Sequence, residues 1–125
     1  MKKHINIALL ISTLTFSVFS FVQAASIEGV IKGAQCYLQK GNCSKSKNDP
    51  HLVLENDFVL VTSDKYYFLP NLPREEKLSV YNEMVRIEGN IANKSIEVER
   101  LIQNHGDSED ILWDEQEIFS ELYED

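Results

Sequence analysis

The chain has 125 residues and a formal net charge of −8, from 20 acidic and 12 basic side chains. Nucleic-acid binding needs a positive face for the phosphates, so we expect no nucleic-acid partner for a chain this acidic. The acids are concentrated at one end, since residues 104–125 contain nine Asp or Glu and no Lys or Arg.

The first 24 residues have the features of a secretory signal peptide. Lys2 and Lys3 give a positive start, an apolar run extends from Ile5 to Val22, and small residues lead to a cleavage point after Ala24 or Ala25. A membrane anchor is the alternative, but polar residues dilute the run and no basic stop signal follows it. We therefore expect an exported bacterial protein, in the periplasm or outside the cell, with no stable membrane anchor after cleavage. The remaining residues, about 100 in number, suffice for one small domain.

The first predicted strand is Ile27 to Gly33, where apolar and polar residues alternate. Gly29 and Gly33 fall on one face of this strand, which indicates a bent segment that another backbone approaches closely. The polar stretch that follows, Ala34 to Asp49, predicts a long loop.

Both cysteines of the exported part, Cys36 and Cys43, lie in this loop. In an oxidising compartment their spacing predicts one disulfide bond that closes a short loop. The alternative is a metal pair completed by His51 or His105, but this set matches no known zinc spacing. We expect no metal and no other cofactor.

The most hydrophobic stretch after the signal peptide predicts a buried β-hairpin with strands Phe58 to Val61 and Tyr66 to Leu69. Pro73 then suits the first turn of a short helix over residues 74–80. Two alternating segments follow, residues 84–91 and 95–102, with a tight turn between them. Leu101 leaves the alternation, so we expect a β-bulge near Arg100.

Five strands with a short helix between the third and fourth are the order of an OB-fold. The sequence therefore predicts an all-β domain over residues 25–103, a five-stranded OB-like barrel, followed by an acidic tail with an amphipathic helix. The competing fold is a five-stranded antiparallel sheet packed on one helix.

Several short motifs resemble those of a group of small exported bacterial proteins: Asp49-Pro50-His51, Asp57 to Val61, Lys65 to Asn71, Pro73-Arg74 and Val85 to Asn90. The resemblance covers roughly residues 27–101. It implies a signal peptide, a cysteine-bearing loop and a five-stranded OB-like barrel, and it implies no reaction.

The acidic tail predicts a helix that Asp107 or Ser108 caps. On a helical projection from residue 111, apolar side chains gather on one face and acids on the other, with Trp113 at the back. The apolar face either docks on the barrel itself or binds a partner groove, and the candidate residues for partner binding are Ile111, Leu112, Ile118, Phe119 and Leu122. The acidic face argues against membrane binding.

No motif for catalysis is found, because no Ser or Cys has a His and a carboxylate at a known spacing. OB-like barrels bind ligands along strands 2 and 3, and the neighbouring aromatic residues there cannot all point inward. The candidate ligand-binding residues are Lys65, Tyr66, Tyr67 and Arg74. The alternative is that the aromatic rings only pack on a neighbouring strand.

These observations predict a non-enzymatic module that binds a protein, a peptide or a small ligand through the barrel face or the tail helix. The first alternative is a structural or stress-related periplasmic protein whose tail only completes its own fold. The second is a hydrolase that uses carboxylates.

Overall fold

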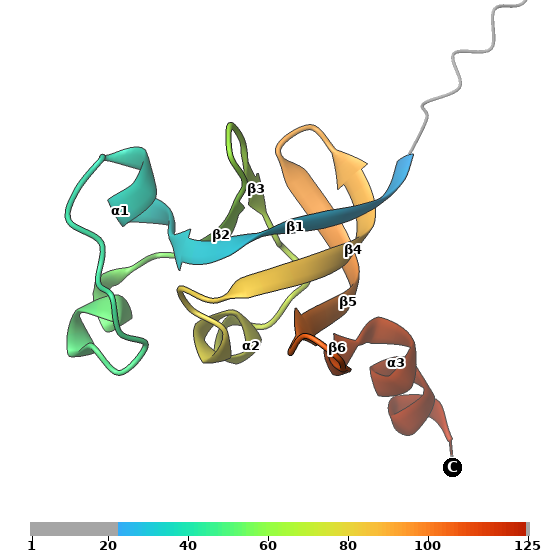
Figure 1. The fold of residues 1–125 in the computed structure, drawn as a ribbon. Helices are drawn as coiled ribbons and strands as arrows, with labels where there is room; N and C mark the ends of the chain where they lie inside the picture. Colours follow the sequence, from blue (N-terminus) through green and yellow to red (C-terminus); the bar gives the residue numbers. More distant parts are fainter. Residues whose placement is uncertain (1–22, 125) are drawn as a thin grey trace, which may run out of the picture.

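The computed structural model describes residues 23–124, in which six strands form one sheet of order β3-β2-β1-β4-β5-β6 (Figure 1). Neighbours in this order are antiparallel. The elements are β1 Gln23–Gly33, α1 Ala34–Leu38, the 3-10 helix η1 Pro50–Leu54, β2 Phe58–Val61, β3 Tyr66–Phe68, α2 Arg74–Ser79, β4 Met84–Ala92, β5 Ser95–Asn104, β6 Glu109–Asp114 and α3 Glu115–Tyr123. The predicted all-β class is confirmed. Most of the predicted signal peptide lies outside the described residues, but Gln23 and Ala24 begin β1.

The sheet also contains one parallel contact, between β3 and β5. Phe68 pairs with Ser95, and the Phe68 N–H donates to the Lys94 carbonyl at 2.7 Å. Strands β3 and β5, which are first and fifth in the strand order, are therefore also in contact with each other. None of the helices formed by residues 23–124 is long and apolar enough to cross a membrane.

Strand β1 pairs with β4 along its first part and with β2 along its second part. It lies across both partners (Figure 1). The predicted close approach at a glycine is confirmed, because a Cβ added to Gly29 would lie 2.6 Å from the carbonyl oxygen of Val61. A side chain at this position would push the two strands apart.

The predicted hairpin is present, but its two strands differ in burial. The first three residues of β2, Phe58, Val59 and Leu60, are fully buried, whereas β3 is only half-buried. The reason is that β2 has β1 and β3 on its two sides, while β3 meets β5 at a single pair. This leaves the side chains of β3 partly exposed to solvent.

The predicted bulge is also confirmed. Glu88 pairs with Arg100 but the next residue, Gly89, pairs with Val98, so Glu99 is the extra residue in β5. This shift returns Leu101 to the buried side of the sheet, where it joins the core.

The loop predicted for residues 34–49 begins with a helix instead, α1. The backbone N–H groups of Gln35 and Cys36, which have no acceptor within the helix, donate to the Glu55 carboxylate at 2.9 and 3.1 Å. An acceptor at the start of a helix stabilises its first turn. Because this cap comes from 19 or 20 residues along the chain, the local sequence gives no sign of it.

The prediction that the tail helix includes Ile111 and Leu112 was wrong. These residues lie in β6, which pairs with the edge of β5, and α3 begins only at Glu115. The helix cap is neither of the two predicted residues, because the Asp114 carboxylate accepts the Gln116 N–H at 2.9 Å. Trp113, expected at the back of the helix, is instead 8% exposed and packs in the core.

The predicted disulfide bond between Cys36 and Cys43 is confirmed. On the chain-entropy model, a loop of this length stabilises the fold by about 2–3 kcal/mol. Reduction should therefore lower the free energy of unfolding by this amount, measured by urea denaturation with and without a reductant. The control is the double variant Cys36→Ser, Cys43→Ser, whose midpoint should not respond to the reductant. Equal midpoints for the oxidised and reduced chain would contradict the prediction.

Candidate functional site

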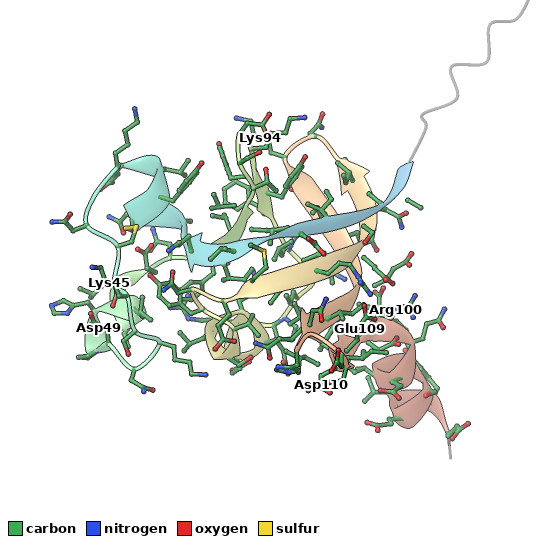
Figure 2. The ribbon with its side chains drawn as sticks, in the orientation of Figure 1. Lys45, Asp49, Lys94, Arg100, Glu109 and Asp110 are labelled. Carbon is green, nitrogen blue, oxygen red and sulfur yellow. A yellow bond between two sulfur atoms is a disulfide. The ribbon has the colours of Figure 1, made fainter. Side chains whose placement is uncertain are left out.

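A cleft of about 610 Å³ lies where the β2–β3 turn faces the β4–β5 turn. Both turns project from the same end of the sheet (Figure 1). Figure 2 shows Lys94 at this end, whereas Arg100, Glu109 and Asp110 lie at the end that carries α3. The lining comes from one turn and β3 on one side, Asp64, Lys65, Tyr66 and Tyr67, and from β4 and its turn on the other, Ile91, Asn93 and Lys94.

Local sequence fixes the shape of both turns. In the first, the Thr62 N–H donates to the Lys65 carbonyl at 2.8 Å, and the Lys65 N–H donates to the Thr62 hydroxyl at 3.2 Å. In the second, Asn93 has a φ of 57°, a left-handed conformation that asparagine tolerates well. The backbone hydrogen bond from Phe68 to Lys94 then holds one rim of the cleft against the other.

The aromatic side chains of β3 point to opposite faces. Tyr67 packs against the core cluster. Tyr66 and Phe68 share the other face, with ring centroids 5.9 Å apart, and Tyr37 of α1 meets the Tyr66 ring edge-on at 5.8 Å. These two neighbours hold the Tyr66 ring in a fixed position at the edge of the cleft.

The cleft is locally positive. The Lys94 ammonium donates to the Tyr66 hydroxyl at 3.2 Å and lies 5.1 Å from its ring centroid. Among residues 23–124, no carboxylate forms an ion pair with Lys65 or Lys94. Asp64 is the one acid in the lining. These groups can donate hydrogen bonds to an anion and pack against an apolar surface.

The fourth predicted ligand residue, Arg74, lies apart from the other three. Its guanidinium donates to the Leu52 carbonyl at 3.1 Å and lies 4.9 Å over the Phe58 ring. It lines a separate groove of about 360 Å³, together with Lys47 and Leu78. Its contacts therefore tie α2 to η1 and β2 rather than to the cleft.

Four residues of the cleft, Asp64, Ile91, Asn93 and Lys94, were not among the predicted site residues. The turn at Asn93 and Lys94 was predicted, and OB-folds use the loop between strands 4 and 5 for binding. The missing information was the contact between β3 and β5, which brings this turn beside Tyr66.

The five predicted partner-binding residues separate into two groups. Leu112 packs against the core, and Ile111, its neighbour on β6, is 54% exposed. The other three are on α3, where Ile118 is 38%, Phe119 56% and Leu122 74% exposed. Tyr123 adds to this surface, because its ring stacks on Phe119 at 5.7 Å. The apolar face of α3 therefore remains open to solvent.

The most perturbed carboxylate lies away from the cleft. A hydrogen bond from the Ser44 hydroxyl, at 2.6 Å, is the main reason that the pKa of Asp49 falls to about 2, and the His51 N–H and imidazole add to it. The same carboxylate caps η1. A carboxylate with so low a pKa is a poor general base at neutral pH, so its hydrogen bonds serve to hold this turn in place. Within the described residues, no three His, Cys, Asp or Glu side chains lie close enough to hold a metal ion.

Comparison of the chain with protein-family models, with curated proteins and with solved structures finds no match. Two features of the molecule itself bear on its function: the cleft between the turns and the open face of α3.

Proposed function

We propose that the chain is an exported, non-enzymatic binding module whose first five strands form an OB-like barrel. The parallel contact of Phe68 with Ser95 supports a barrel, because a closed sheet requires the strand order to return on itself. The resemblance of residues 27–101 to small exported bacterial proteins points the same way. The bond between Cys36 and Cys43 supports an oxidising location, in the periplasm or outside the cell.

The observation that carries the proposal is the cleft between the two turns. It combines an aromatic lining with two ammonium groups, those of Lys65 and Lys94, that form no ion pair with a carboxylate of the described residues. It also lies beside β3, on the side of the fold where OB-like barrels bind their ligands. Its volume of about 610 Å³ is in the size range of small-ligand sites.

Amide NMR spectra of the isotope-labelled exported chain test this proposal. We expect changes in the amide chemical shifts of Lys65, Tyr66, Ile91 and Lys94 when the chain is mixed with an extract of exported material. The small-molecule fraction and the peptide fraction of this extract are tested separately. Tyr66→Ala should abolish these shifts without unfolding the chain, because its side chain is only half-buried. The absence of shifts at the cleft with every fraction would contradict a ligand site there.

A second candidate is a protein-binding role for α3, favoured by the exposure of Phe119, Leu122 and Tyr123. The helix and its flanks carry acids and no Lys or Arg, so charge complementarity points to a partner with an apolar groove and a basic rim. In the NMR experiment, shifts confined to α3 in the presence of a protein fraction would favour this role. The alternative of a tail that only completes its own fold is supported by β6, which buries Trp113, but not by α3.

A further inference from the structure

We infer that the occupant of the cleft is a small organic monoanion, whose acidic group meets Lys65 and Lys94 and whose flat apolar body lies on Tyr67 and Ile91. This inference rests on the proposed ligand site and adds the chemical class of the ligand. It follows from the charge of the lining, its apolar surface and its size.

The charge of the lining is opposite to that of the chain. The chain carries 20 acidic and 12 basic side chains, and four of the bases near other parts of the sheet, Lys47, Lys77, Arg86 and Arg100, are held by carboxylates. Lys65 and Lys94 face the cleft without such a partner among the described residues. An acidic protein repels anions in general, so a locally positive cleft favours anion binding over the rest of the surface around it.

Asp64 limits how much negative charge the ligand can carry. With two lysines and this one acid, the lining has a net charge of only +1. A group with a single negative charge is neutralised there, whereas a polyphosphate would be left with excess charge beside a carboxylate. The lining therefore favours a monoanion over a nucleotide.

The rest of the lining is apolar. Tyr67 and Ile91 are half-buried and pack against the core, so they form a firm floor. The Tyr66 ring makes T-shaped contacts with Tyr37 and Phe68, and the Lys94 ammonium lies over it at 5.1 Å from its centroid, so this ring positions the ammonium. Aromatic rings bind other flat rings by stacking or by edge contacts. A ligand with a flat apolar body thus gains contacts that a compact anion such as acetate lacks.

Three probes with the same ring and different charge test the inference: indole-3-acetate, indole-3-acetamide and tryptamine. Titrations followed by amide NMR should give the tightest binding for the anion, with shifts at Lys65, Tyr66 and Lys94, and at least tenfold weaker binding for the cation. Lys94→Gln and Lys65→Gln should each weaken binding of the anion by roughly two- to fivefold. Added salt should weaken it as well. The control Lys45→Gln removes an exposed lysine outside the cleft and should change nothing.

The outcomes separate this inference from the proposed function. Equal binding of the three probes at the cleft would overturn the preference for an anion but retain the ligand site. If none of the three probes binds, but the extract of exported material still changes the amide chemical shifts at the cleft, the inference is overturned and the proposed ligand site is retained. Tighter binding of plain acetate than of indole-3-acetate would contradict the claim that the ligand has a flat apolar body. Tighter binding of a blocked Asp-Phe peptide would overturn the small-molecule occupant.

Discussion

Replacing Trp113 by alanine should lower the free energy of unfolding by about 3–5 kcal/mol, as truncation of a large buried aromatic side chain usually does. Trp113 is 8% exposed, belongs to the core cluster and pairs with Leu101 across β5 and β6. The substitution leaves a cavity and also loosens β6 from the sheet. Urea denaturation followed by circular dichroism measures the change.

Trp113→Phe is the matched variant for this experiment. The buried indole N–H of Trp113 has no hydrogen-bond acceptor in the part of the chain that the structure describes. Phenylalanine keeps most of the apolar contact and removes this unsatisfied donor, so it should recover much of the lost stability. A loss as large as that of Trp113→Ala would contradict the packing role.

Truncation of the chain after Asp114 separates β6 from α3. Because the apolar side chains of α3 are exposed, its removal should change the free energy of unfolding by less than about 1 kcal/mol. The bidentate contact of Arg86 with Glu109, at 2.6 and 2.9 Å, remains in this variant and continues to hold β6. A loss comparable to that of Trp113→Ala would show that α3 is part of the fold rather than a surface for a partner.

The substitution Gly89→Ala should lower the free energy of unfolding by about 3 kcal/mol or more, at the upper end of overpacking effects. A Cβ at this position would lie 2.1 Å from the carbonyl oxygen of Glu97. This atom belongs to the backbone of β5, next to the bulge, and cannot rotate away as a flexible side chain would. Strands β4 and β5 must therefore move apart, and thermal denaturation should show a clear fall in Tm.

Gly41→Ala is the control for this prediction. A Cβ at Gly41 would have its nearest neighbour, the Cys36 carbonyl oxygen, at 3.9 Å, which is ordinary contact. The substitution should therefore leave stability within about 0.5 kcal/mol, or raise it slightly by restricting the unfolded chain. Equal effects at the two glycines would contradict the close approach of β4 and β5.

Local patterns were enough to predict much of the fold. Alternating residues marked β1, β4 and β5, and the break in alternation at Leu101 located the bulge. The short helix after Pro73 and the bond between Cys36 and Cys43 also follow from residues close together in sequence. Of the site, the sequence indicated Lys65, Tyr66 and Tyr67, because a strand must turn some of its neighbouring aromatic side chains outward.

Only the tertiary structure decided the features that depend on residues far apart in the sequence. Helix α1 forms because the Glu55 carboxylate reaches its first N–H groups, and the cleft exists because β3 meets β5 beside the turn at Lys94. The tail shows the physical reason most clearly. Residues 109–114 are too short a run for helical and strand periodicity to be told apart, so the free edge of β5 and the space in the core for Trp113 select a strand.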